Sequence, residues 1–381
     1  MLGLLLSCAT ASLDFKFEVA GREPLMFAGL AAQPDLWGTT AYADNRSMFT
    51  FGSDGFMVGT VWNDSSWFTL TRERWGEDAH IQPHGEAGHC AGGVAITNRT
   101  RRYDRWWQRG ACYQSSSVRP LRVSMTLVVG ANAIESFGGA TRTRGHMAHM
   151  VRMANNVFGG HLNMQLAVDE LILSDGTLPM DSTRTDAGCA QNAGDTLDEL
   201  AVWVAGRGNA LLHYVDDCRP RTGGSYTAGM AYIGVLCHPT LNTGVTYVSA
   251  EADETWHTFA HEVGHNLGAN HPFGKDETLA GTFGGLMDYY MPWVRQRSGA
   301  LLEAFNTAST KADICAHVGA VVGTPQCDGK VRHLTAAEHA VRVGQWFWLP
   351  VGLGVGAGAV LLVVCIVRSR PVPTAGLYVR L

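Results

Sequence analysis

Short apolar runs separated by turn residues dominate the first quarter of the chain. Residues 48–61, M-F-T-F-G-S-D-G-F-M-V-G-T-V, are representative, since apolar positions there are interrupted by Gly, Asp and Thr. Such patterning is typical of β-hairpins rather than helices. We therefore predict a β-rich unit over residues 13–102.

The pattern changes from about residue 115, where apolar strand-like stretches alternate with helical periods. We predict strands at Leu121–Val129, Leu162–Leu173, Leu211–Val215, Met230–Cys237 and Gly244–Ser249. We predict helices at His146–Phe158, Asp195–Val204, Lys311–Val321 and Thr335–Val343. This order indicates an α/β (α+β) domain with a twisted mixed sheet of about five strands and helices packed on it.

One stretch, residues 258–271, reads T-F-A-H-E-V-G-H-N-L-G-A-N-H. His261 and His265 are four residues apart, so on a helix they project from one face. Gly268 is suited to end the helix in a left-handed turn that brings His271 back toward them. A bare H-E-x-x-H recurs by chance in unrelated proteins, but the full H-E-x-x-H-x-x-G-x-x-H pattern is much more specific.

The residue types in this stretch match the needs of a catalytic zinc site. Catalytic Zn²⁺ usually has three protein ligands and an open position for water, which His261, His265 and His271 would provide. Zinc lowers the pKa of its bound water to about 7. Glu262, beside the first histidine, could take that proton and pass it to a leaving amine.

These residues resemble the active site of an ADAM-type (adamalysin/reprolysin) metzincin metalloprotease, most similar to the Kuzbanian-like membrane sheddases. The run from Leu241 to His271 carries the resemblance, together with G-M-A-Y-I-G-V-L-C before it and G-G-L-M-D-Y-Y after it. Two positions depart from the family pattern: Pro272 replaces an aspartate, and Leu-Met-Asp stands where Ile-Met-Tyr is frequent. No stretch corresponds to the disintegrin and cysteine-rich modules.

The resemblance implies further roles. Met287 would lie beneath the metal in a methionine-containing turn, although a methionine between apolar neighbours is more often core filler. An exposed edge strand would pair with an extended peptide substrate. Our candidate for that edge consists of Gly229, Met230, Ala231, Tyr232 and Ile233, and the alternative is an ordinary capped edge. Family members of this subgroup shed the ectodomains of membrane proteins.

Composition limits the other classes of function. The 381 residues carry a net charge of −5, with 46% hydrophobic and 17% charged residues, which fits two folded units plus tails. No basic block or basic patch interleaved with aromatic residues is present, so we predict no nucleic-acid partner.

Residues 346–367 contain no charged side chain. Twenty-two residues span a bilayer core of about 30 Å, and Trp346 and Trp348 suit its interface. Arg368 and Arg370 then place the tail, 368–381, in the cytosol and the preceding chain outside it. We predict a single-pass type I membrane protein, the alternative being a buried core helix. Glycine pairs spaced by four, such as Gly352 and Gly356, would allow a weak dimer.

The N-terminus, residues 1–12, resembles a signal peptide with an Ala9-Thr10-Ala11 cleavage site, although its apolar run is short and no basic residue precedes it. A truncated start and a lipoprotein-like box at residues 5–8 are the alternatives. Sequons at Asn45, Asn63 and Asn98 agree with secretion from a eukaryotic cell.

Nine cysteines occur, and leaving out Cys8 and Cys365 gives an odd number in the extracellular part. The basic sequence R-T-R-R ends at Arg102 and suits a furin-like convertase, unless it is only a solvated loop. Cutting there would leave six cysteines, enough for three disulfides of unknown pairing. Among them, Cys315 and Cys327 are available to staple the predicted helix at 311–321.

Cys90 would then remain with the N-terminal piece. Its thiolate is a candidate cysteine switch that fills the open zinc position of a latent protease; the alternative is a free or mispaired thiol. We accordingly predict a prodomain at 13–102 and a metalloprotease domain at 103–345.

Our leading hypothesis is a membrane-anchored zinc endopeptidase, made as a zymogen, that cleaves extracellular proteins or membrane-protein ectodomains. A second hypothesis is a catalytically silent membrane glycoprotein that binds peptides or partners through the same fold. A third is a secreted protease. The zinc motif favours an enzyme, because its three histidines and its glutamate are all intact.

Overall fold

The computed structural model describes residues 12–17, 25–43, 47–62, 67–74, 80–84, 119–182, 184–185, 188–219, 221–222, 225–248, 252–276, 283, 285–288, 305, 310–336 and 338. Within these ranges, no helix combines the length and apolar character needed to cross a bilayer. The predicted membrane segment 346–367, the tail 368–381, nearly all of the signal segment 1–12, Cys90 and Arg102 lie outside the described residues. They stay predictions.

The first quarter of the chain forms a seven-stranded antiparallel sheet in which each strand pairs with the next along the chain. This confirms the predicted hairpins. Its strands are β1 (Ser12–Phe17), β2 (Leu25–Leu36), β3 (Thr39–Ala43), β4 (Ser47–Phe51), β5 (Met57–Trp62), β6 (Trp67–Arg72) and β7 (His80–His84). Buried apolar side chains such as Leu30, Phe49 and Leu70 form its own core.

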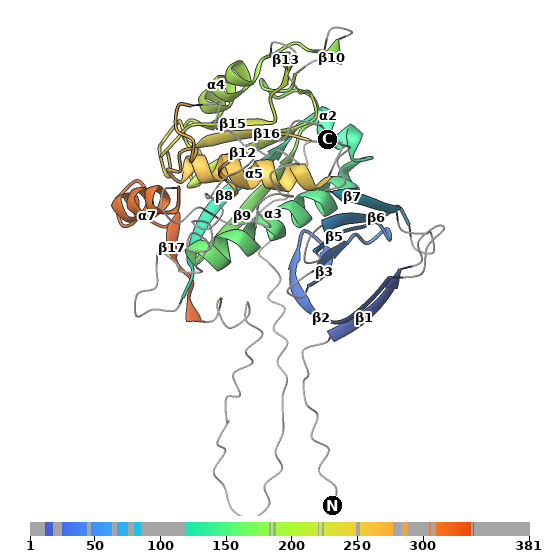
Figure 1. Ribbon diagram of the computed structural model, residues 1–381. Coiled ribbons are helices and arrows are strands. Elements are labelled where there is room, and N and C mark those ends of the chain that lie inside the picture. The colour runs from blue at the N-terminus through green and yellow to red at the C-terminus, as the bar shows by residue number, and fades with distance from the viewer. Residues whose placement is uncertain are drawn as a thin grey trace, which may run out of the picture.

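The second sheet is mixed and lies at the centre of the molecule (Figure 1). It contains β8 (Leu121–Val129), β9 (Met164–Leu173), β12 (Leu211–Asp216), β15 (Gly229–Ala231), β16 (Thr243–Tyr247) and β17 (Val331–His333). Central β8 pairs in parallel with β9 on one side and β12 on the other. Eight of the nine β8 residues are buried, which explains its nearly continuous apolar run, since helices cover both faces of the sheet.

The strands predicted at 121–129, 162–173, 211–215 and 244–249 are confirmed with small changes of boundary. The strand predicted at Met230–Cys237 is wrong in extent, because only Gly229–Ala231 pairs with β16. Gly234 and Cys237 adopt positive φ angles of 66° and 63°. The backbone N–H groups of Gly234 and Val235 donate to the His265 and Asn266 carbonyls instead of to a strand. These two carbonyls lie at the end of the helix that contains the histidine motif. Short β17 was not predicted; it pairs with the start of β8.

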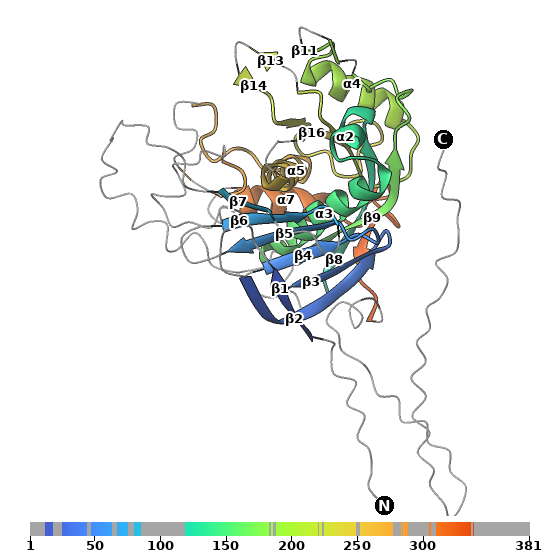
Figure 2. The same ribbon diagram turned by 90° about the vertical axis from the view of Figure 1, so that its right-hand side faces the viewer.

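Helices cover the central sheet on both faces (Figures 1 and 2). The helices are α2 (Ala131–Ser136), α3 (Ala140–Leu162), α4 (Ala193–Val204), α5 (Ala252–Asn266) and α7 (Thr310–Val321). Helix α4 packs on one face through Leu197, Leu200 and Val204. Helices α3 and α5 pack on the other face and form the larger core with β8. The N-terminal sheet lies against the outer side of α3 (Figure 2).

Helix α3 is longer than the predicted His146–Phe158 and is buried around most of its circumference. It is therefore not simply amphipathic, because a sheet lies on each side of it. The contact with the N-terminal sheet is partly polar. The Arg152 guanidinium donates to the Thr39 and Thr50 hydroxyls at 3.1 and 3.2 Å. His149 Nε2 lies 3.0 Å from the Thr60 hydroxyl oxygen. These bonds supply partners for buried polar groups that would otherwise be costly.

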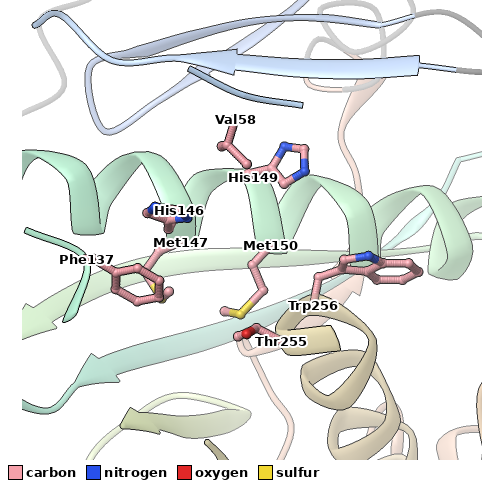
Figure 3. Close-up of a pocket in the computed structure, with 8 residues that line it drawn as sticks. All are labelled: Val58, Phe137, His146, Met147, His149, Met150, Thr255 and Trp256. Atoms are coloured by element: carbon pink, nitrogen blue, oxygen red, sulfur yellow. The ribbon is translucent and has the colours of Figure 1, made fainter. Parts of the chain in front are cut away.

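A small pocket lies where β5, α3 and the first turn of α5 meet (Figure 3). Val58 of the N-terminal sheet, His146 and His149 of α3, and Thr255 and Trp256 of α5 all line it. The N-terminal sheet thus reaches the beginning of α5 as well as α3.

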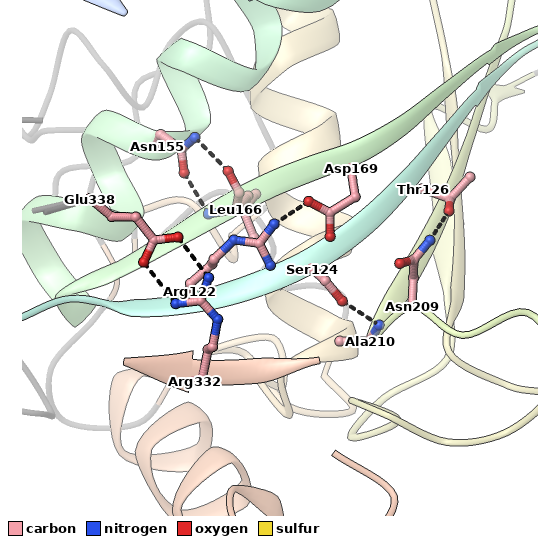
Figure 4. A network of polar contacts seen from close by, with 10 residues as sticks. All are labelled: Arg122, Ser124, Thr126, Asn155, Leu166, Asp169, Asn209, Ala210, Arg332 and Glu338. Atoms are coloured by element: carbon pink, nitrogen blue, oxygen red, sulfur yellow. Dashed lines mark hydrogen bonds and ion pairs between the residues drawn. The ribbon is translucent and has the colours of Figure 1, made fainter. Parts of the chain in front are cut away.

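A polar network holds the start of the central sheet together (Figure 4). The Asn155 amide donates to the Leu166 carbonyl at 2.9 Å and accepts from the Leu166 N–H at 2.7 Å, which ties α3 to β9. The Ser124 hydroxyl accepts from the Ala210 N–H at 3.0 Å and fixes the entry to β12. The guanidinium of Arg332, a residue of β17, forms an ion pair with the Glu338 carboxylate.

Two disulfides are described, Cys189–Cys218 and Cys237–Cys327. The expectation that Cys315 and Cys327 staple α7 is therefore wrong. After α7 the chain returns to pair β17 with β8, which brings Cys327 to Cys237 at a Cα separation of 5.2 Å. Cys315 is disulfide-bonded as well. Disulfides persist in oxidising compartments, which indicates an extracellular or secreted domain.

Candidate metal centre

Helix α5 presents the first two histidines of the motif from adjacent turns of one buried face. His271 follows the helix and completes a cluster in which one ligand nitrogen from each ring lies within 4.8 Å of the others. His271 Nε2 lies 3.1 Å from His261 Nε2 and 3.0 Å from His265 Nε2. A tetrahedral zinc with bonds of 2.0–2.1 Å places its nitrogen ligands about 3.3 Å apart. The two distances from His271 are therefore close to those of a tetrahedral zinc site.

The turn after α5 brings His271 into this position. The helix ends at Asn266, and Gly268 has a φ of 105° that L side chains rarely adopt. The Gly268 N–H donates to the His265 carbonyl at 2.8 Å and the Ala269 N–H to the Gly264 carbonyl at 3.0 Å. These bonds close the helix end and turn the chain back, as the motif predicted.

Backbone carbonyls orient the two helical rings. His261 Nδ1 lies 2.7 Å from the Leu286 carbonyl oxygen, and His265 Nδ1 lies 2.8 Å from the Ala269 carbonyl oxygen. Because a carbonyl only accepts, each Nδ1 carries the proton and each Nε2 keeps a free lone pair. Metal-ligating histidines typically have this second hydrogen bond, which sets tautomer and ring direction.

Burial keeps the three rings in their ligand form. It lowers the pKa of His261 well below its usual range and also lowers that of His265. Burial, with a smaller contribution from the neighbouring His265, lowers the pKa of His271 to about 4. At neutral pH the imidazoles are thus uncharged, as metal ligation requires.

Glu262 lies on α5 between the two ligand positions and is buried. Burial raises its pKa to about 8, whereas a bound cation would favour the ionised form. The side chain packs directly against β15, because a Cβ at Gly229 would lie 2.7 Å from Glu262 Oε1. The candidate base is therefore adjacent to the candidate edge strand.

Met287 lies beneath the helix that carries two of the histidines. It is 1% exposed, and a Cβ at Gly264 would lie 2.4 Å from its sulfur. Gly264 thus permits the methionine turn to pack directly under α5. The preceding residue, Leu286, supplies the carbonyl that orients His261.

The candidate edge strand is the outermost strand on its side of the central sheet, within the part that the structure describes. Met230 and Ile233 are 37% and 52% exposed. The Tyr232 hydroxyl donates to Asp198 of α4, and its carbonyl accepts from the Asn266 amide at 2.9 Å. Gly229, Met230 and Ala231 form β15 proper, while Tyr232 and Ile233 follow it.

Sequence reasoning missed the part that α7 plays in this site. Asp313 and His317 of α7 contact the turn between His265 and His271. Nothing in the local pattern could indicate this, because these residues lie more than forty positions downstream.

Comparisons with known proteins agree with this geometry. Residues 119–291 match the family model Reprolysin_5, described as metallo-peptidase family M12. The snake venom metalloproteinase atroxlysin-1 of Bothrops atrox is 47% identical over 50 residues, covering 13% of this chain and 25% of that protein. The snake venom metalloproteinase Ac1 of Deinagkistrodon acutus is 26% identical over 155 residues, covering 39% of this chain and 72% of its own length.

Among solved structures, metalloproteinase-II from Bacteroides fragilis matches with a TM-score of 0.44 at 14% sequence identity, covering 76% of this chain and 91% of that one. A chaperone–substrate complex matches with a TM-score of 0.33 at 12% identity, covering 70% and 35%. The family match spans β8 through the methionine turn and includes the whole histidine cluster. Residues 119–291 are therefore similar to metallopeptidases of family M12, of the reprolysin type, and they contain a histidine triad suited to binding zinc.

Proposed function

We propose that this protein is a zinc-dependent endopeptidase that hydrolyses peptide bonds in extracellular proteins, including the ectodomains of membrane proteins. One observation carries the proposal: the buried imidazoles of His261 and His265 and the half-buried imidazole of His271, all uncharged at neutral pH, converge on one point next to the buried Glu262. Bound zinc would supply a polarised water and a Lewis acid for the scissile carbonyl.

The residues of this chain have separate tasks in the proposal. His261, His265 and His271 hold the metal through Nε2. Glu262 accepts a proton from the attacking water and returns it to the leaving amine. The outer edge of β15 pairs with the substrate backbone and aligns the scissile bond beside Glu262. The contact between Gly229 and the Glu262 side chain supports this arrangement.

The proposal includes latency. Cleavage after Arg102 would separate a prodomain, 13–102, from the protease domain, 103–345. Before that cut, the Cys90 thiolate would block the open metal position and exclude water. The antiparallel sheet of β1–β7, distinct from the protease sheet, supports a separate N-terminal unit.

The proposal also includes a location and a subgroup. The uncharged segment 346–367 would anchor the protein as a type I membrane protein with its catalytic domain outside the cytosol, and its glycine pairs would allow weak dimerisation. This membrane location supports a Kuzbanian-like sheddase rather than a secreted enzyme. The disulfides of the protease domain support an oxidising compartment.

The experiment compares the secreted ectodomain, ending before Trp346, with Glu262→Ala on a library of quenched peptides. Exposed Glu135 of α2 offers a matched control, Glu135→Ala. We expect endoproteolysis in the parent and the control, abolition by a zinc chelator, and a loss of at least about 100-fold in Glu262→Ala, as expected for a general base. No cleavage by correctly processed, zinc-loaded parent protein would instead favour a silent binding glycoprotein.

A further inference from the structure

Helix α7 lies against the turn that carries the third zinc ligand. A Cβ at Gly268 would lie 2.6 Å from His317 Cβ and 3.4 Å from the Asp313 carbonyl oxygen. The Asn270 amide donates to the Asp313 carboxylate at 3.3 Å. The helix therefore touches the turn at two positions, one on each side of Ala269.

Ala269 is the important residue between these contacts. Its carbonyl accepts from His265 Nδ1 at 2.8 Å and sets the direction of that ring. His271 follows two residues later. A displacement of the turn would therefore misdirect two of the three imidazoles at once.

His317 also contacts the segment that follows the edge strand. A Cβ at Gly234 would lie 3.5 Å from the His317 ring. The Gly234 N–H donates to the His265 carbonyl at 2.9 Å. The His317 imidazole thus lies beside both the Gly268–Asn270 turn and the segment that contains Gly234.

The end of α7 is attached to the same region by a covalent bond. Cys327, six residues after the helix, is bonded to Cys237, three residues after Gly234. This disulfide limits how far α7 can move away from the turn. The Cys237–Cys327 disulfide therefore helps to keep His317 and Asp313 in contact with the turn.

We propose that His317 and Asp313 are positioning residues that hold the Gly268–Asn270 turn, and through it His265 and His271, in the geometry for zinc. The inference deepens the proposed function, since it assigns the support of the same metal site. Groups that orient metal ligands typically change metal affinity by about 10–100-fold when they are removed.

The test measures the zinc dissociation constant of the ectodomain by chelator competition, independently of peptide cleavage. We expect His317→Ala to weaken zinc binding about tenfold or more, and Asp313→Ala by a smaller factor. His317→Phe keeps a planar ring beside both glycines and should stay within about threefold of the parent. Asp328→Ala removes an exposed carboxylate just beyond α7 and should leave the zinc affinity unchanged.

A second readout uses the zinc-free protein. Amide hydrogen exchange at Gly268 and Ala269 should be faster in His317→Ala and Asp313→Ala than in the parent, because the turn opens more often. Zinc affinity and exchange rates equal to the parent in both variants would overturn the proposal. If His317→Ala does not fold, Asp313→Ala alone decides through the same two measurements. Failure of the proposed function is distinct, since it would appear as zinc-binding parent protein without peptidase activity.

Discussion

Close packing determines which residue types fit around the metal centre as much as the chemistry of the site does. Gly264 leaves room for the Met287 sulfur, and Gly229 leaves room for the Glu262 side chain. Gly268 meets two requirements at once, a left-handed backbone and space for His317. The site therefore depends on residues that neither bind metal nor move protons.

Gly268→Ala tests this point. A Cβ there adds backbone strain at φ 105°, which costs about 1–3 kcal/mol. It also collides with His317, which adds about 1–3 kcal/mol. We expect a total loss of about 2–6 kcal/mol in the free energy of unfolding. Gly323→Ala is the matched control, since Gly323 follows α7 at φ 85° with open space around it. The measurement is urea denaturation of both variants. Equal losses would show that the contact with His317 has no energetic weight.

At the scale of the element, α3 is the helix that joins the two sheets. Its His149 is buried, with the Thr50 and Thr60 hydroxyls of the N-terminal sheet beside its ring nitrogens and His146 and Arg152 of α3 as charged or titratable neighbours. Burial, with smaller contributions from these two neighbours, lowers the pKa of His149 to about 3. The interface therefore holds an uncharged imidazole at neutral pH.

This burial predicts acid sensitivity. The unfolded chain takes up a proton on His149 near pH 6.5, whereas the folded chain takes it up only near pH 3. Stability from this group is thus complete above pH 6.5 and falls by up to about 1.4 kcal/mol per pH unit below it. In zinc-free protein, His149→Gln keeps hydrogen-bonding groups but does not titrate. Between pH 7 and pH 4 the parent should lose up to about 3 kcal/mol more than the variant in urea denaturation. If the free energies of unfolding of the parent and the variant change with pH in parallel, the lowered pKa assigned to His149 is contradicted.

The same elements show what local pattern can and cannot predict. The spacing of His261, His265, Gly268 and His271 lies within one helix and its turn, so the sequence correctly predicted that the three histidines cluster. The Cys237–Cys327 pairing depends on where β17 returns to β8. The early end of β15 depends on hydrogen bonds to α5. Both are long-range contacts with no local signal.

At the scale of the whole molecule, the chain joins an antiparallel N-terminal sheet to a mixed sheet enclosed by helices (Figure 1). The hairpin pattern predicted the first unit, and the strand–helix alternation predicted the second. Their docking was not predicted, because His149 and Arg152 look like ordinary polar residues of a helix until Thr39, Thr50 and Thr60 are placed against them. Buried polar contacts between distant segments have no periodicity.

The central claim is that three histidines of this chain hold one zinc ion. X-ray absorption at the zinc edge, combined with metal analysis of the purified ectodomain, tests it most directly. We predict one zinc per chain with three nitrogen ligands at about 2.0–2.1 Å, plus one sulfur ligand if Cys90 blocks the uncut form and an oxygen ligand after cleavage. Protein that contains no zinc after loading, or zinc with fewer than three nitrogen ligands, would contradict the account.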